Sequence, residues 1–183
     1  MTQTDEGMNR AGQSTGGEVR RVRFDDEAVS PLLVGLGEEY AARYGAIDEL
    51  KHTTVEEFEP PDGAFFVVVV DGETVAGGGF RRLTHETCEI KRVWTSPAHR
   101  RRGLAGVVLD AIEAVAADAG YRVAWLETGP SQPEAVAFYE GRGYRPIPLY
   151  NPRYKEALAF GRPLEQRPAG SDPPYASQET EEA

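Results

Sequence analysis

The chain has 183 residues, of which 40% are hydrophobic and 27% are charged, and its formal net charge at pH 7 is -10. This composition is ordinary for one globular domain and excludes a fibrous or wholly disordered chain. The acidic balance argues against nucleic-acid binding, which needs a basic face to displace counterions from phosphates. The single cysteine, Cys88, excludes a disulfide framework and a thiolate zinc cluster within one chain, and the three histidines lack ligand spacing, so no metal site is predicted.

Both ends of the chain are poor in residues that could form a core. Residues 1–18 are mostly small or polar, and residues 165–183 are rich in Pro, Ser, Gln, Glu and Gly. We expect both ends to be disordered tails around one domain at residues 19–164. The N-terminus lacks a cationic start followed by an apolar stretch, and no apolar run reaches membrane-spanning length. A cytoplasmic protein that binds no membrane is therefore expected.

The N-terminal part of the domain predicts a strand followed by two helices. Apolar and basic residues alternate over residues 19–24, as in a strand with one solvated face. Leucines and tyrosines recur at helical spacing between residues 28 and 44, although a proline and two glycines weaken this helix. A second, short helix is expected at residues 54–58, and the Pro-Pro-Asp-Gly run that follows marks a turn.

The middle of the chain predicts three antiparallel strands. Residues 64–70 are dense in β-branched and aromatic residues, an Asp-Gly turn follows, and residues 74–83 form the other arm of a hairpin. After a short connection, residues 88–95 add a third strand. Three consecutive glycines, Gly77–Gly79, lie inside the middle strand, where glycine indicates a bulge or a close approach of another backbone.

The second half of the domain alternates helices and strands. Residues 104–119 place apolar side chains at i, i+3, i+4 and i+7, which predicts an amphipathic helix that Gly120 ends. The elements expected after it are a buried strand at residues 123–128, a helix at 133–142, a strand after Gly143-Tyr144 and a closing strand within residues 154–163.

The expected order of elements is β-α-α-β-β-β-α-β-α-β-β. It predicts an α/β (α+β) fold with a mixed, mostly antiparallel central sheet flanked by helices. Because a strand–helix–strand crossover is right-handed in nearly all proteins, the strands at residues 88–95 and 123–128 should lie parallel in this sheet. The sequence contains no internal repeat.

The run Arg100–Ala105 stands between the strand at residues 88–95 and the amphipathic helix. A helix N-terminus leaves main-chain N–H groups unpaired and carries a partial positive charge, so a glycine turn with added arginines favours a phosphate ligand there. The run lacks the signatures of a nucleoside triphosphatase loop and of a dinucleotide-binding turn, and both functions are disfavoured. A solvated basic loop remains the alternative.

Two stretches of the chain resemble motifs of one enzyme family. Residues 89–97, together with Arg100–Ala105, resemble motif A of the GNAT superfamily of N-acetyltransferases. Further along the chain, residues 132–144 resemble motif B, whose usual form is Asn-x-x-Ala-x-x-x-Tyr-x-x-x-Gly-Phe, with Gln132 in place of the asparagine. Two motifs in the family's order are more specific than either motif alone, and the resemblance covers residues 19–164.

The resemblance implies that acetyl-CoA binds in a wedge where the two parallel strands splay apart. Main-chain groups at Val93 and Thr95 would bond the pantetheine, the N–H of Val93 would also reach the thioester oxygen, and N–H groups from Arg101 to Ala105 would bond the pyrophosphate. The residues implied to bind the cofactor are Val93, Trp94, Thr95, Arg100, Arg101, Arg102, Gly103, Leu104, Ala105 and Gln132. The bond from Gln132 stays open, because its side chain is one methylene longer than asparagine.

The resemblance also implies two catalytic side chains. Tyr139 would be the general acid, since a phenol with an ordinary pKa of about 10 stays protonated at neutral pH, and a core tyrosine is the alternative. Glu89 would be the base that takes a proton from the amine, and a sheet-surface glutamate paired with Lys91 or Arg81 is its alternative. Glu127, on the next strand, is the competing base.

The implied activity is transfer of an acetyl group from acetyl-CoA to a primary amine of an unidentified small molecule or peptide, directly within a ternary complex. The alternative is a non-catalytic acyl-CoA-binding sensor or interaction module, which the presence of both Tyr139 and Glu89 disfavours. The sequence leaves a homodimer open. The resemblance implies that the acceptor is selected by Glu38-Glu39-Tyr40, Tyr44, residues 47–58 and residues 150–154. The acids and tyrosines of these segments favour a small cationic amine, and a solvated helix face is the alternative for Glu38 and Glu39.

Overall fold

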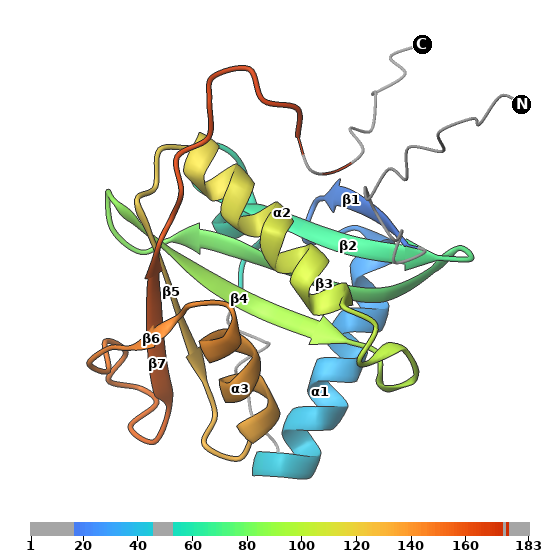
Figure 1. Cartoon of the computed structure of the whole chain (residues 1–183). Helices are drawn as coiled ribbons and strands as arrows, with labels where there is room; N and C mark the ends of the chain where they lie inside the picture. Colours follow the sequence, from blue (N-terminus) through green and yellow to red (C-terminus); the bar gives the residue numbers. More distant parts are fainter. Residues whose placement is uncertain (1–16, 46–52, 174, 176–183) are drawn as a thin grey trace, which may run out of the picture.

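The computed structural model describes residues 17–45, 53–173 and 175 (Figure 1). The elements are, in chain order, β1 (Glu18–Val22), η1 (Glu27–Val29), α1 (Ser30–Tyr44), η3 (Val55–Phe58), β2 (Ala64–Val70), β3 (Glu73–Arg82), β4 (Thr87–Thr95), η4 (Pro97–His99), α2 (Leu104–Asp118), β5 (Val123–Thr128), α3 (Pro133–Gly141), β6 (Arg145–Pro146) and β7 (Leu158–Pro163). Apart from two added short helices, η1 and η4, this is the order that the sequence predicts. Part of the expected acceptor segment, residues 47–52, lies outside the described residues, as do residues 1–16, 174 and 176–183 of the expected tails.

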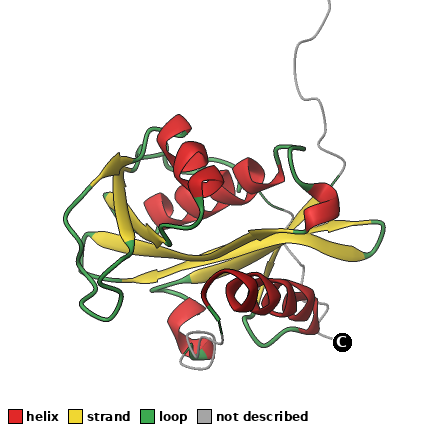
Figure 2. Cartoon of the chain, turned by 90° about the horizontal axis from the view of Figure 1, so that it is seen from below, coloured by secondary structure: helices red, strands yellow, loops and turns green. Residues whose placement is uncertain are grey.

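The strands of the described chain form one sheet in the order β1-β2-β3-β4-β5-β7-β6. β4 and β5 lie parallel, and every other neighbouring pair is antiparallel. This confirms the mixed, mostly antiparallel sheet and the parallel pair expected from the sequence. Helices lie on both faces of the sheet (Figure 2). None of the helices in the described residues is long and apolar enough to cross a membrane.

The sheet has an apolar core on each face because its central strands carry apolar residues at successive positions. On β2, Phe66 and Val68 belong to the core beneath α2, whereas Phe65 and Val67 belong to the core beneath α1. All four side chains are fully buried, and burying a side chain of this size contributes about 1.5–3 kcal/mol. The unbroken apolar run of β2 therefore supports a helix layer on either side of the sheet.

The helix α2 lies between two glycines in the left-handed conformation. Gly103 has φ 77° at the N-cap, and Gly120 has φ 93° just beyond the C-cap. Between them, Val108 and Ile112 are fully buried on the face that the amphipathic spacing predicts. Because the left-handed conformation costs a residue with a Cβ atom about 1–2 kcal/mol, the two glycines favour a helix that begins and ends at these points.

The three glycines of β3 face a β-bulge in β4. The register sets the three residues Gly77–Gly79 against the four residues Lys91–Trp94, so β4 carries one extra residue here. Arg92 takes a positive φ of 62° within the bulge. A Cβ atom on Gly78 would approach the Cα atom of Val93 to 3.1 Å, which is tighter than ordinary contact. The glycine run thus marks both a bulge and a close backbone approach, as predicted.

β4 and β5 separate beyond a short paired stretch. Thr87–Ile90 pairs with Val123–Leu126, and no further pairing joins the two strands. The bulge bends β4, while β5 stays paired with β7 as far as Thr128. Figure 1 shows the two strands diverging from the end at which they pair. Their facing edges beyond that point therefore carry main-chain groups that no described strand pairs.

Residues 165–173 follow β7 and contact the end of α2. Arg167 forms an ion pair with Asp118 at 2.7 Å. Gln166 donates its side-chain amide to the main-chain oxygen of Tyr121 at 3.1 Å. The sequence places this stretch in a tail, and these contacts attach its first residues to the body of the domain.

Candidate active site

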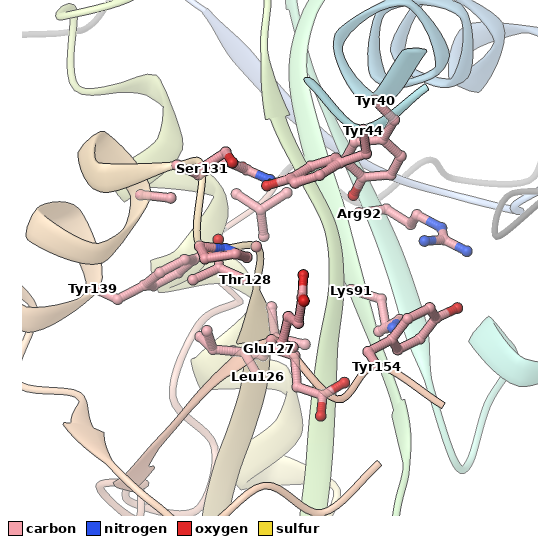
Figure 3. Close-up of a pocket in the computed structure, with 18 of the residues that line it drawn as sticks. Tyr40, Tyr44, Lys91, Arg92, Leu126, Glu127, Thr128, Ser131, Tyr139 and Tyr154 are labelled. Carbon is pink, nitrogen blue, oxygen red and sulfur yellow. The ribbon is translucent and has the colours of Figure 1, made fainter. Parts of the chain in front are cut away.

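A cavity of about 450 Å³ opens where β4 and β5 separate (Figure 3). Its walls come from both strands, from the C-terminal end of α1, from the β5–α3 connection and from residues 153–157 before β7. The lining side chains include Tyr40, Tyr44, Glu127, Gln132, Tyr139 and Tyr154. The volume is in the range of small-molecule sites, about 300–1,000 Å³, so the cavity is large enough to hold reacting groups.

Tyr139 lies on α3 and lines the cavity, with 8% of its surface exposed. The rings of Phe138 and Tyr144 contact it edge-on, at centroid distances of 5.2 and 5.7 Å. Burial raises the pKa of Tyr139 above its ordinary value, and the nearby Tyr40 adds to the rise. The phenol therefore stays protonated at neutral pH and is available to donate inside the cavity.

Glu127 enters the cavity from β5, between Tyr139 on one side and Lys91 on the other (Figure 3). Both carboxylate oxygens are buried, and neither meets a donor at hydrogen-bond geometry among the described residues. Burial raises the pKa of Glu127, the charge of Glu89 raises it further, and Lys91 and the nearby Asn151 offset part of the rise. A buried carboxylate of this kind is suited to take a proton from a ligand.

Glu89, the base candidate of motif A, lies outside the cavity lining. Its side chain is 1% exposed. Arg81 donates to one carboxylate oxygen at 2.8 Å, the hydroxyl of Tyr150 donates to the other at 3.1 Å, and Lys91 lies 3.7 Å away. The sequence left two interpretations of Glu89 open, a catalytic base and a surface glutamate paired with Lys91 or Arg81. The structure has the pairing, but the carboxylate is buried and not on the surface.

The C-terminal end of α1 closes one end of the cavity by contacting the β5–α3 connection. Arg43 donates to the main-chain oxygen of Ser131 at 2.6 Å and forms an ion pair with Glu134. Gln132 donates its side-chain amide to the hydroxyl of Tyr44 at 3.2 Å. The motif B residue whose bond to the cofactor was left open therefore contacts α1, at the rim of the cavity.

The run Arg100–Ala105 lies between the short helix η4, which follows β4, and the N-terminal end of α2. Arg101 and Gly103 both take positive φ values, 60° and 77°, in the turn that leads into the helix. All three arginines of the run are exposed, and Arg100 forms an ion pair with Glu39 of α1. The turn therefore presents positive charge and a helix N-terminus together, which is the composition of an anion site.

The other residues implied to bind a cofactor differ in what they expose. Val93 lines the cavity. Trp94 and Leu104 are core residues with 7% and 1% of their surfaces exposed, so Leu104 could contribute only main-chain groups. The hydroxyl of Thr95, at the end of β4, is buried and has no partner among the described residues. The structure thus brings Val93, Gln132 and Tyr139 together around the cavity.

The cavity also contains charged side chains that the sequence patterns did not mark. Arg92, at the bulge, is 6% exposed and donates to the hydroxyl of Thr53 at 2.6 Å. Lys155 and Glu156 come from the connection before β7. The glycine run Gly77–Gly79 predicts the bulge, but it does not indicate that Arg92 is the residue of β4 with the irregular backbone. The described residues contain no group of three or more side chains that could hold a metal ion.

A mixed sheet whose single parallel pair splays open at a cavity, beside a helix N-terminus preceded by arginines, is the arrangement of the GNAT class of fold. The acetyltransferase (GNAT) family matches residues 33–144 of the chain. YjgM of Escherichia coli, an uncharacterised N-acetyltransferase, is 30% identical over 141 residues, which span 70% of this chain and 82% of YjgM. The chain therefore belongs to the acetyltransferase (GNAT) family.

Solved structures share this fold. A provisionally assigned acyl-CoA N-acyltransferase from Klebsiella pneumoniae superposes with a TM-score of 0.68 at 22% identity, over 83% of this chain and 100% of that chain. A GNAT family acetyltransferase from Elizabethkingia anophelis, solved with acetyl-CoA bound, superposes with a TM-score of 0.60 at 14% identity, over 82% of this chain and 100% of that chain. At these identities the similarity is one of fold, and it confirms the GNAT-type fold expected from the motifs.

Proposed function

We propose that this protein is an acetyl-CoA-dependent N-acetyltransferase that transfers the acetyl group directly to a primary amine of a small molecule or peptide. The observation that carries the proposal is the cavity in which Glu127 of β5 and Tyr139 of α3 face the same space beside the bulge of β4. Acyl transfer to an amine needs one group that takes a proton and another that gives one. Glu127 is a carboxylate whose pKa burial raises, which suits it to take a proton, and Tyr139 is a phenol that stays protonated, so it can give one.

Features of the splayed strands and of the adjoining turn support an acyl-CoA ligand. The diverging edges of β4 and β5 leave main-chain groups for the pantetheine amides, and the buried hydroxyl of Thr95 lacks a partner among the described residues. Exposed arginines precede Gly103 at the start of α2. We assign Val93 and Thr95 to the pantetheine and the N–H groups of Arg101–Ala105 to the pyrophosphate. The acetyl-CoA in the Elizabethkingia relative supports the choice of donor.

Bound acetyl-CoA supplies an acetyl group activated as a thioester. Glu127 takes a proton from the amine nitrogen as the carbon–nitrogen bond forms, and the N–H of Val93 donates to the thioester oxygen. Tyr139 gives its proton to the sulfur as the carbon–sulfur bond breaks, and it regains a proton from solvent while Glu127 releases one. We assign the base to Glu127 and not to Glu89, because protein groups outside the cavity already bond both oxygens of Glu89.

Two measurements test this function. Isothermal titration calorimetry should give micromolar affinity for acetyl-CoA, and free thiol should appear when acetyl-CoA is mixed with a suitable member of a panel of amines, peptides and aminoglycosides. Initial rates with both substrates varied should give intersecting reciprocal plots, as direct transfer in a ternary complex requires.

Each outcome has a distinct meaning. No binding of acetyl-CoA at micromolar concentration contradicts the donor, and parallel reciprocal plots contradict direct transfer. Binding without thiol release across the whole panel would favour the non-catalytic acyl-CoA sensor.

A further inference from the structure

The connection between β6 and β7, residues 147–157, supplies one wall of the cavity without forming a helix or strand of its own. Residues 153–157 line the cavity, and Tyr154 stands beside Lys91 in Figure 3. A loop that forms part of a binding site needs contacts that fix it to a rigid element. The contacts of this connection with the sheet therefore bear on the shape of the cavity.

Tyr150 is a residue of this connection whose side chain contacts both β4 and β5. Its hydroxyl donates to Glu89 on β4 at 3.1 Å, and its ring contacts the ring of Trp125 on β5 with a centroid distance of 5.1 Å. Burial raises the pKa of Tyr150, and the charge of Glu89 raises it further, so the phenol stays protonated and donates. One side chain thus ties the connection to both strands that border the cavity.

Glu89 also forms an ion pair with a side chain on the neighbouring strand β3. Arg81 of β3 donates to it at 2.8 Å and forms a second ion pair with Glu57 of η3. The carboxylate is 1% exposed, so it accepts the bond from Tyr150 away from competing water. Glu57, Arg81, Glu89 and Tyr150 therefore form a continuous chain of bonds from η3 across the sheet to the connection.

We propose that Glu89 and Tyr150 are positioning residues that hold the 147–157 connection as the acceptor-binding wall of the cavity. The inference rests on the proposed function and takes from the family resemblance that residues 150–154 select the acceptor; what it adds is the pair of side chains that hold these residues in place. The turn Arg100–Ala105, which we assign to the pyrophosphate, contributes no residue to the cavity lining. The connection and that turn therefore serve different substrates.

The first test is Tyr150→Phe, which removes the hydroxyl and keeps the ring on Trp125. Loss of one hydrogen bond to a charged group should raise KM for the acceptor about tenfold, with kcat and the affinity for acetyl-CoA unchanged. The matched control is Tyr144→Phe, which removes a similar bond, from its hydroxyl to Glu113 at 2.8 Å, outside the cavity lining. The control should keep the KM of the unmodified protein; an unchanged KM in Tyr150→Phe overturns the proposal.

A second test does not depend on activity. Tyr154 and Ala157 donate main-chain hydrogen bonds within the connection, to Asn151 at 3.3 Å and to Tyr154 at 3.1 Å. In Tyr150→Phe, hydrogen exchange of this segment should speed up about tenfold, and in Tyr144→Phe it should stay unchanged. Unchanged exchange in both variants overturns the anchor even if acetyl transfer is found, whereas faster exchange in Tyr150→Phe supports the anchor even if no amine is acetylated.

A third variant, Glu89→Gln, removes the charge of Glu89 and keeps a bond to Tyr150, because the amide oxygen accepts from Arg81 while the amide N–H group donates to the hydroxyl of Tyr150. The groups that face Glu127 are Glu89 and Lys91 from β4 and Tyr150 and Asn151 from the connection. Removing the charge of Glu89 lowers the pKa of Glu127, so the acid limb of kcat/KM should move to lower pH while KM changes less than in Tyr150→Phe. A KM rise in Glu89→Gln as large as in Tyr150→Phe, with the acid limb unmoved, contradicts the proposed division of roles.

Discussion

Burial shifts the pKa values of the two side chains that we assign to catalysis in the same direction. It raises the pKa of both Glu127 and Tyr139, because removal of water disfavours the carboxylate and the phenolate alike. The consequences for the reaction are opposite and complementary. A carboxylate with a raised pKa is a stronger base, whereas a phenol with a raised pKa is a weaker acid that stays fully protonated at neutral pH.

The substitution Glu127→Gln should lower kcat/KM by about 10²–10⁴-fold, the usual contribution of a general base. In the unmodified protein, kcat/KM should rise with pH as Glu127 loses its proton, at a pH above the ordinary carboxyl pKa of 4.5, because burial raises this pKa. The variant should lack this limb, and a pH series of initial rates measures it. Glu140→Gln, on an exposed residue of α3 outside the cavity lining, is the matched control and should keep the full profile.

The substitution Tyr139→Phe should keep the affinity for acetyl-CoA and lower kcat by about 10²–10⁴-fold, since it removes a proton donor and little volume. Calorimetry and steady-state rates on the same preparation separate the two effects. Turnover at the level of the unmodified protein would remove Tyr139 from the mechanism and leave it as a core residue of α3.

At the scale of elements, the local patterns of the sequence predict most of the fold. The apolar run 64–70, the Asp-Gly turn after it and the helical spacing from residue 104 are strong signals, and the structure has β2, β3 and α2 at these places. β6 is predicted only by the Gly143-Tyr144 exit from the preceding helix, because its two residues, Arg145–Pro146, are too few to give a strand pattern of their own; they pair with β7.

The candidate site is only partly predictable for a related reason. Alternation along a strand says which residues share a face, but it does not say which of them a distant segment covers. Glu89 lies outside the cavity lining and accepts a bond from Tyr150, which is far away in sequence, and the positive φ of Arg92 lies at the bulge where β4 pairs with β3. Motif spacing finds Tyr139, whereas the choice between Glu89 and Glu127 needs the tertiary structure.

The N-terminal end of α2 offers a test at this scale, because glycines in the left-handed conformation stand at both ends of the helix. Gly103→Ala and Gly120→Ala should each lose about 1 kcal/mol of unfolding free energy through the strain of a positive φ. Only Gly103→Ala should also weaken acetyl-CoA binding, since its turn is assigned to the pyrophosphate. Urea denaturation and calorimetry measure the two effects. Equal affinity in both variants would contradict that assignment.

At the scale of the whole molecule, the sheet consists of two parts joined by one short stretch. β1 to β4 form one part and β5, β7 and β6 the other, and only Thr87–Ile90 and Val123–Leu126 pair across the junction. A ligand in the wedge beyond this stretch contacts both parts. Its binding should therefore stabilise the folded molecule as a unit.

Acetyl-CoA at about a hundredfold excess over its Kd should add about 2.7 kcal/mol to the free energy of unfolding, which raises Tm by about 5–10 °C for a chain of this size. Differential scanning calorimetry measures the shift. Adenosine 3′,5′-diphosphate at the same concentration, which lacks the pantetheine and the pyrophosphate link to it, should give a much smaller shift. Equal shifts would contradict occupation of the wedge.

The position of β7 between β5 and β6 has a consequence for how the protein is made on the ribosome. β5 leaves the ribosome before residues 158–163, so its outer edge stays open in the nascent chain until β7 arrives. The 147–157 connection, with Tyr154, reaches its place only when that strand docks. A nascent chain that ends before β7 would therefore contain the first hairpin and α2, but no complete cavity between its strands.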